Sequence, residues 1–284
     1  MKKLLTGCLA LVLCTSCGNG KNGTDPFDAL TRMVDSVGFP STSVPAIDSA
    51  VVLKPLEADE LFDDFIFNYA LDRTLQMQRT VFPLPYDCNG ALKRIEKDAW
   101  QHDNLFAEQN FYTLMFDRER DMDVVGDTAL TSVQVEWLYL QQREVQRYYF
   151  QRKRGMWMLD SISRHKIPEE ENMRSGFISF YARFVTDSLY QRQHIHSPLM
   201  FVTLDPDDEF SILETTLDVD QWYAFRPIMP IDPLSNICYG QPNNPNSSTK
   251  ILKVNGIGNG YSNIFYFRKR HGEWELYKYE DTSI

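Results

Sequence analysis

One stretch near the middle of the chain recurs near its C-terminus. The sequence FQRKRGMWML runs from Phe150 to Leu159, and FRKRHGEWEL runs from Phe267 to Leu276. Phenylalanine, glycine, tryptophan and leucine match at a constant offset of 117 residues. Each copy reads as a strand, a basic turn with glycine and a second strand, because glycine supplies the positive φ that a tight hairpin turn needs. Two similar β-hairpins are therefore expected.

A second region upstream of each hairpin also matches, which argues against chance. Its offset is 115, and the matched residues are Phe62, Phe65, Tyr69, Asp72, Leu75, Gln78, Pro83 and Leu84 with Phe177, Phe180, Phe184, Asp187, Tyr190, Gln193, Pro198 and Leu199. The two offsets differ by only two residues, so the repeats have nearly equal length. A period this long indicates two copies of one domain and not a solenoid.

The expected organisation follows from these matches and from composition. Residues 1–17 are a lipoprotein signal peptide, 18–55 a flexible tether, 56–164 the first repeat, 165–175 a charged linker and 176–284 the second repeat. A length of 284 residues fits two domains.

Each repeat reads as helices followed by strands. Apolar residues at helical spacing predict a long helix from Leu61 towards Pro83, a shorter helix over Leu92–Trp100, and a helix over Phe177–Leu189. Strand-like segments are 111–119, 133–139, 145–151 and 156–162, then 201–204, 210–217, 251–254, 261–269 and 273–279, with 221–226 a strand or short element. A long proline-rich loop is expected over Pro227–Ser248.

This order, with a meander ending in Gly-x-Trp, resembles the nuclear transport factor 2-like fold. The resemblance implies an α+β protein of two tandem domains, each with an N-terminal helix pair packed on a curved antiparallel sheet that forms a cone. Together with the N-terminal signal, it is also similar to lipoproteins of Gram-negative gut bacteria. Enzymes of this fold class, such as ketosteroid isomerase-like members, place an aspartate, tyrosine or histidine inside the cone.

The N-terminus predicts a membrane address. Lys2 and Lys3 precede an apolar stretch that is too short to span a membrane, and CTSC follows, with Cys17 at its end. This resembles the bacterial lipoprotein box and implies a lipid on Cys17, although Cys14 stands where leucine is usual. Lipidation at Cys8 and an ordinary cleaved signal stay as alternatives. Gly18 implies transfer to the outer membrane, facing the periplasm or the cell surface.

Charge and cysteine content narrow the function. A net charge of −10 argues against a nucleic-acid partner, since such proteins carry clustered basic residues. After lipidation the two domains hold Cys88 and Cys238. An oxidising periplasm permits a disulfide between them, and two free thiols are the alternative.

Candidate chemistry is sparse. Asp72 and Asp187 occupy matched positions, and a carboxylate buried in a cone can act as a general base, but each also fits a helix surface. His194 and His196 can share one face of a strand, yet a third metal ligand is missing, so no metal site or cofactor is expected.

Aromatic residues on strand-like segments are the candidate ligand contacts. Core packing must take most aromatic side chains, but those on one face of a strand can line a cone. The candidates are Trp137, Tyr139, Trp222, Tyr223 and Tyr261.

The sequence therefore favours a non-catalytic envelope lipoprotein that binds a small molecule or an envelope protein through its cones or surfaces. The alternative is an isomerase, dehydratase or hydrolase that uses a pocket carboxylate. We also expect Trp157 and Trp274 to pack on the first helix of their own repeat, against Phe65 and Phe180, and each repeat to form an independent core.

Overall fold

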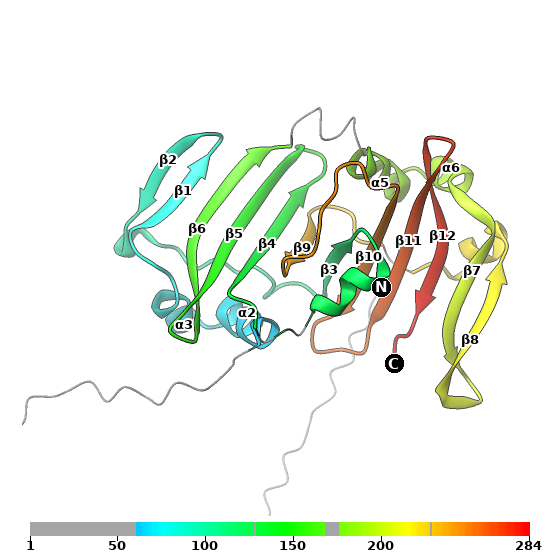
Figure 1. The fold of residues 1–284 in the computed structure, drawn as a ribbon, viewed down its shortest axis with the longest axis horizontal. Coiled ribbons are helices and arrows are strands. Elements are labelled where there is room, and N and C mark those ends of the chain that lie inside the picture. Colours follow the sequence, from blue (N-terminus) through cyan, green and yellow to red (C-terminus); the bar gives the residue numbers. More distant parts are fainter. Residues whose placement is uncertain (1–60, 126, 128, 168–175, 228) are drawn as a thin grey trace, which may run out of the picture. The chain divides into compact units, whose positions relative to one another are not determined.

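The structure is a computed structural model that describes residues 61–125, 127, 129–167, 176–227 and 229–284 (Figure 1). Cys17, the expected signal peptide, the tether and most of the expected linker lie outside the described residues. Strand β6 (Met156–Lys166) extends two residues into the segment expected to be the linker.

The first half contains helices followed by strands. Its elements are α2 (Phe62–Leu71), α3 (Arg73–Gln78), β1 (Leu84–Cys88), β2 (Ala91–Ile95), the 3-10 helix η1 (Lys97–Ala99), β3 (Phe111–Phe116), the 3-10 helix η2 (Glu119–Val124), β4 (Ser132–Tyr139), β5 (Glu144–Lys153) and β6.

The second half repeats this order. Its elements are α5 (Phe177–Thr186), α6 (Ser188–Gln193), β7 (Ile195–Asp205), β8 (Asp208–Leu217), α7 (Val219–Phe225), β9 (Leu234–Cys238), β10 (Thr249–Gly256), β11 (Ser262–Arg270) and β12 (Glu273–Asp281). No helix in the described part of the chain is long and apolar enough to span a membrane.

The matched aspartates break each long helix into a pair. Asp72 accepts hydrogen bonds from the backbone N–H groups of Thr74 and Leu75, and so caps α3. Asp187 caps α6 in the same way. A side-chain oxygen at this position satisfies N–H groups that have no partner within the helix. The expected helix pair is therefore formed by one interrupted segment.

The expected helix over Leu92–Trp100 is wrong. Asn89 and Gly90 both have positive φ and connect β1 to β2, which pair as an antiparallel hairpin. Asn-Gly between strands favours this turn because both residues tolerate the left-handed conformation. The turn chemistry outweighs the apolar spacing of the segment, and only η1 remains helical.

Two six-stranded sheets have the same strand order, and the expected α+β fold is confirmed. The first is β2-β1-β6-β5-β4-β9 and the second is β8-β7-β12-β11-β10-β3. Both are mixed and not purely antiparallel, because β1 pairs with β6 and β7 with β12 in parallel. Even the register shifts match, at Tyr149/Phe150 and at Tyr266/Phe267.

The two halves exchange one strand each. In the first sheet β9 of the second half pairs with β4, and in the second sheet β3 of the first half pairs with β10. Both exchanged strands lie in the middle of Figure 1, between the two groups of strands. The long loop expected over 227–248 therefore contains a strand that completes the opposite sheet.

The exchanged strands meet at matched residues. In the two sheets Thr113 and Ser235 stand opposite Val254 and Trp137, which are themselves equivalent positions. The backbone N–H of Thr113 donates to the Ser235 Oγ at 3.0 Å, and the Thr113 hydroxyl donates to the Ser235 carbonyl. A position that contacts its own counterpart marks a local two-fold relation, as in a symmetric dimer interface.

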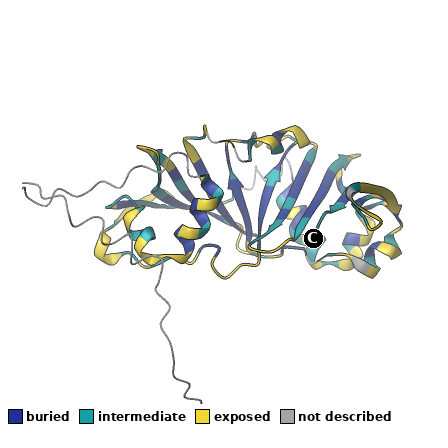
Figure 2. Cartoon of the chain, turned by 90° about the horizontal axis from the view of Figure 1, so that it is seen from below, coloured by how far each residue is buried: buried dark blue, intermediate teal, exposed yellow. Residues whose placement is uncertain are grey.

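The hydrophobic cores are shared and not independent. The core around α2 includes Ile237, Ile251 and Tyr266 from the second half. The core around α5 includes Leu138 and Val145 from the first half. Figure 2 shows the strands largely buried, whereas the helices expose one face. The expectation of separate cores is wrong because each exchanged strand joins the opposite sheet.

The two matched tryptophans are structural, as expected. Trp157 is fully buried and its ring packs at 5.1 Å from Phe62. Trp274 packs at 5.1 Å from Phe177, the matched residue, and at 6.4 Å from Phe180. Trp157 thus contacts the helix at Phe62, one turn before the expected Phe65.

Replacing Trp157 with alanine should destabilise both halves together. We expect a loss of about 3–5 kcal/mol in the free energy of unfolding, from lost burial and the cavity left behind. Calorimetry should show a single transition in the wild type and in Trp157→Ala, shifted to lower temperature in the variant. Met158→Ala, on the half-buried neighbour, is the control. Two separate transitions, of which only one moves, would contradict the shared core.

Candidate functional site

A cavity of about 500 Å³ lies where the two halves meet. We call it the inter-repeat cavity. Its walls come from β3, β4, β5, β9, the end of β6, the start of α5 and the loop before β10. The residues around it are Met115, Phe116, Asp117, Glu136, Leu138, Val145, Arg147, His165, Lys166, Ile167, Phe177, Ile178, Asn236, Cys238, Gln241, Pro242, Asn243, Pro245 and Lys250.

Strand register places a polar row across one wall. Glu136 on β4 stands opposite Arg147 on β5 and opposite Asn236 on β9. Since side chains alternate along a strand, Val135 and Ile237 point to the opposite face, into the core around α2. The polar row therefore occupies the face of the first sheet that α2 does not cover.

Glu136 is buried and has several donors. Arg147 Nε donates to Oε1 at 2.7 Å, and Asn236 Nδ2 donates to Oε2 at 2.8 Å. The thiol of Cys238 also donates to Oε2, at 3.3 Å. A buried carboxylate needs this kind of compensation, since losing water costs it several kcal/mol (order of magnitude). Asn236 is held in turn by the Met115 N–H at 2.8 Å.

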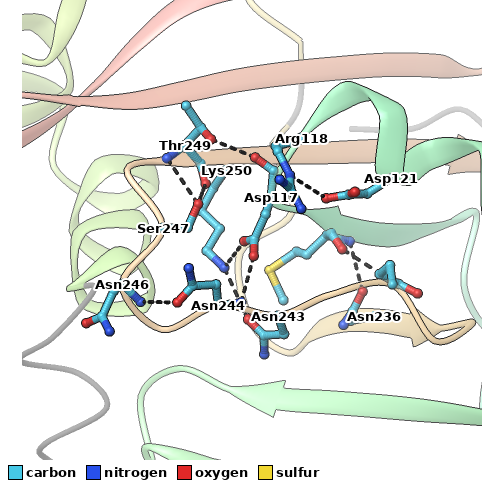
Figure 3. Close-up of polar contacts among 12 residues, drawn as sticks. Asp117, Arg118, Asp121, Asn236, Asn243, Asn244, Asn246, Ser247, Thr249 and Lys250 are labelled. Carbon is cyan, nitrogen blue, oxygen red and sulfur yellow. Dashed lines mark hydrogen bonds and ion pairs between the residues drawn. The ribbon is translucent and has the colours of Figure 1, made fainter.

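A second ion pair, between Lys250 and Asp117, also lines the cavity (Figure 3). Lys250 Nζ lies 2.5 Å from Asp117 Oδ1, and both side chains are less than 10% exposed. Lys250 also donates to Asn243 at 3.1 Å, and the Asn244 N–H donates to Asp117 Oδ2 at 2.6 Å. These bonds fix the loop between β9 and β10 against the end of β3.

One end of the cavity is apolar. Leu138 and Val145 stand opposite each other, two residues along the same sheet face from Glu136 and Arg147. They belong to the core around α5, whose Phe177 also lines the cavity. The lining therefore changes from ion-paired to apolar side chains within two residues along the strands.

The equivalent positions in the second sheet carry different side chains. The matched pairing of β4 with β5 and of β10 with β11 makes Arg147 equivalent to Ile264. The exchanged strands likewise make Asn236 equivalent to Leu114 and Cys238 equivalent to Phe116. Ile264, Leu114 and Phe116 are buried in the core around α2. The fold therefore accepts apolar side chains at these positions, and the polar cluster belongs to the first sheet, with residues from both halves.

Cys238 is a protonated thiol. Burial raises its pKa well above the usual thiol value, and the neighbouring Glu136 carboxylate raises it further. A thiol with a raised pKa forms little thiolate, which is the nucleophilic species. Cys88 and Cys238 are both free, so the disulfide that the sequence allowed is not formed.

The five aromatic candidates do not converge on this cavity. Trp137 and Trp222 are buried in the two cores, and Tyr261 packs at 6.4 Å from Phe111. Tyr139 lies under the Arg164 guanidinium at 5.0 Å, and the Tyr223 hydroxyl donates to the Ser188 carbonyl at 2.7 Å. None of the five is among the residues that line the inter-repeat cavity.

Trp222 takes part in a hydrogen-bond network that has an equivalent in the first half. Gln191 is buried, donates to the Phe184 carbonyl at 3.0 Å and accepts from Trp222 Nε1 at 3.5 Å. Gln76 does the same with the Tyr69 carbonyl, at 3.1 Å, and with Trp100 Nε1, at 3.1 Å. This network holds the helix pair to the segment after the first hairpin.

The catalytic candidates Asp72 and Asp187 are exposed helix caps. Backbone donation from Tyr190 lowers the pKa of Asp187. A different carboxylate lines the open cavity near Trp100: Asp103 accepts from the Tyr148 hydroxyl at 2.5 Å and from the Leu105 N–H at 3.1 Å. Both of its oxygens are thus occupied by protein donors.

The histidine pair is separated. His194 ends α6 and bonds to the Tyr190 carbonyl at 2.7 Å, whereas His196 lies 3.6 Å from Glu275 on β12. Across the described residues, no group of three or more His, Cys, Asp or Glu side chains could hold a metal.

Sequence reasoning missed the cavity residues because they come from many segments. The sequence does contain one signal. When the two copies are aligned at the offset of 117, Arg147 corresponds to Ile264 and Glu136 corresponds to Lys253. Such mismatches between copies mark positions that the fold itself does not determine.

Comparison with known proteins places the chain among related sequences. Residues 48–281 match the family model described as Domain of unknown function (DUF4348). The crystal structure of a nuclear transport factor 2-like (NTF2-like) protein from Bacteroides fragilis NCTC 9343 is 58% identical, covers 81% of this chain and 100% of its own, and has a TM-score of 0.77. An NTF2-like protein of unknown function from Shewanella baltica OS155 is 13% identical over 40% of this chain and 92% of its own, with a TM-score of 0.22. No curated protein matches.

The state of Cys238 can be tested by alkylation. With iodoacetamide at pH 8, Cys238 should react more slowly than Cys88, because its raised pKa leaves it as a thiol. Peptide-resolved mass spectrometry of the full chain measures both rates. Glu136→Gln removes the adjacent negative charge and should speed the reaction at Cys238. Equal rates at Cys88 and Cys238 in the wild type would contradict this assignment.

Proposed function

The chain belongs to the family described as Domain of unknown function (DUF4348). From the residues of its own cavity, we propose that it is a non-catalytic binding protein of the cell envelope. Its ligand is a small molecule held in the inter-repeat cavity. This replaces the cones and the five aromatic residues as the expected place of binding.

The observation that carries the proposal is the difference in side chains between equivalent positions of the two sheets. Burying charged groups costs stability unless they are well paired, and apolar side chains of similar volume often serve the fold as well or better. At the equivalent positions the chain itself uses Ile264, Leu114 and Phe116. Retaining Arg147, Asn236 and Cys238 around an open volume is therefore better explained by a ligand than by folding.

Size and lining support a small-molecule ligand. Binding cavities for small molecules typically measure about 300–1,000 Å³ and combine apolar walls with a few placed polar groups. The inter-repeat cavity has about 500 Å³, with Leu138, Val145 and Phe177 at one end and two ion pairs at the other.

The chemistry favours binding over catalysis. Glu136 receives three donors and Asp117 is ion-paired, so neither carboxylate is free to take a proton from a substrate. The Cys238 thiol is poorly nucleophilic because its pKa is raised. An enzyme acting through Asp72 or Asp187 would have to use exposed caps that already accept backbone hydrogen bonds.

The envelope location rests on the N-terminus. The basic start, the apolar stretch and CTSC support a lipid on Cys17 and attachment to the outer membrane, with the domains on the periplasmic side or at the cell surface. The partners are then the membrane, through the lipid, and a small molecule or envelope protein. The net charge of −10 disfavours nucleic acid.

Binding can be measured with N-phenyl-1-naphthylamine, an uncharged dye whose fluorescence rises in apolar surroundings. We expect saturable binding of one dye per chain. Cys238→Phe introduces the side chain found at the equivalent Phe116 and should fill part of the cavity. Its dye affinity should fall about tenfold, which corresponds to about 1.4 kcal/mol.

Ala99→Phe is the control, because Ala99 lines a different open cavity, near Trp100. It should leave dye binding unchanged. Melting temperatures of both variants must stay near the wild-type value. No dye binding by the wild type, or weakening by Ala99→Phe and not by Cys238→Phe, would refute the proposed site.

The lipid anchor has its own test. Metabolic labelling with a clickable fatty acid should tag the wild type, and Cys17→Ser should abolish the tag because the thiol is the attachment point. Cys8→Ser should retain it. Labelling that survives Cys17→Ser, or that is lost only in Cys8→Ser, would move or remove the anchor.

A further inference from the structure

We propose that the inter-repeat cavity takes an amphipathic monocarboxylate, with its carboxylate on Arg147 and its apolar body along Leu138, Val145 and Phe177. This inference rests on the proposed function and adds the chemical class of the ligand. It is carried by three features of the cavity: the geometry of one guanidinium, the balance of charge around it and the position of the apolar wall.

The guanidinium of Arg147 has N–H donors that the described residues do not use. Its Nε bonds to Glu136 at 2.7 Å, and 30% of the side chain is exposed. Among the described residues, its two terminal nitrogens have no hydrogen-bond partner. A guanidinium presents its donors in a planar fork, which matches the two oxygens of a carboxylate. Glu136 therefore fixes the side chain, while its outer edge stays available to a ligand.

The cavity is positively charged within an acidic chain. Arg147, Lys250 and Lys166 line it with two carboxylates, Glu136 and Asp117, so the lining has one more positive than negative side chain. The whole chain carries −10. His165 also lines the cavity and lies 3.4 Å from Asp87, which is outside the lining. A local positive charge inside low-dielectric walls attracts a single anionic group.

The apolar wall lies where the body of such a ligand would extend. Leu138 and Val145 follow Glu136 and Arg147 by one alternation on the same face of the sheet. Phe177 and Ile178, at the start of α5, line the same cavity. Burying an alkyl chain here strengthens binding with each methylene group that leaves water. Head and tail thus have separate contacts.

The equivalent positions on the second sheet support the same assignment. There the position of Arg147 is Ile264, and Lys253 replaces Glu136. Lys253 has the Asp63 carboxyl as a charged neighbour, and Asp63 also binds the Tyr239 hydroxyl. Lys253 on the second sheet therefore has a carboxyl neighbour on α2, whereas Arg147 keeps an open edge.

The experiment compares dodecanoate with dodecanol as competitors for bound N-phenyl-1-naphthylamine, below their micellar concentrations and at pH 8. The two probes share a chain and differ in the head group. Dodecanoate should displace the dye at about tenfold to hundredfold lower concentration, the range expected for a charge-assisted hydrogen-bonded pair. Arg147→Gln should remove this preference while dodecanol still competes.

A second variant guards against loss of stability. Glu136→Gln/Arg147→Gln keeps a hydrogen-bonded neutral pair and should also bind dye without preferring dodecanoate. Equal competition by dodecanoate and dodecanol in the wild type would overturn the assignment, as would a preference that survives both variants. Dodecyl phosphate competing better than dodecanoate would replace the carboxylate by a phosphate. Absence of dye binding would instead refute the proposed function.

Discussion

The backbone pairing of β3 with β10 and of β9 with β4 is the constraint on which the rest of this molecule depends. Without the exchange, β4 and β10 would each present an unpaired edge, which proteins normally cover or blunt. Exchange covers both edges with the other half of the same chain, and it brings Thr113 and Ser235 into contact at the local two-fold. The inter-repeat cavity follows from this, because β9 carries Asn236 and Cys238 onto the polar face of the first sheet.

A duplicated fold provides an internal comparison. Residues that match between the halves, such as the Gln76–Trp100 and Gln191–Trp222 pairs, make equivalent hydrogen bonds and hold equivalent elements together. Residues that differ, such as Arg147 and Ile264, sit in the same backbone setting but have different surroundings. Matched positions therefore serve the fold, and a mismatch that replaces an apolar core side chain by a half-buried charge points to another use.

Much of the fold could be predicted because its signals are local. The helical spacing of Phe62, Phe65 and Tyr69, and the Gly-x-Trp hairpins, depend on neighbours a few residues away. The exchange could not be predicted in this way, since the pairing of Leu234–Cys238 with β4 spans about a hundred residues and leaves no periodic trace. The Asn89-Gly90 turn and the capping by Asp72 do have recognisable sequence signals. The apolar spacing around them, however, is also typical of a continuous helix.

The aromatic residues predicted from the sequence differ from those lining the inter-repeat cavity for a related reason. Aromatic side chains are typical of binding clefts, yet in this fold Trp137 and Trp222 are buried in the two cores. What remains for a ligand lies between the cores, where the sheet face changes from Leu138 and Val145 to Glu136 and Arg147 within one alternation. Neither half can build this surface alone: the first supplies the ion pair, and the second supplies β9, α5 and Lys250. A binding site of this kind therefore requires both copies of the fold.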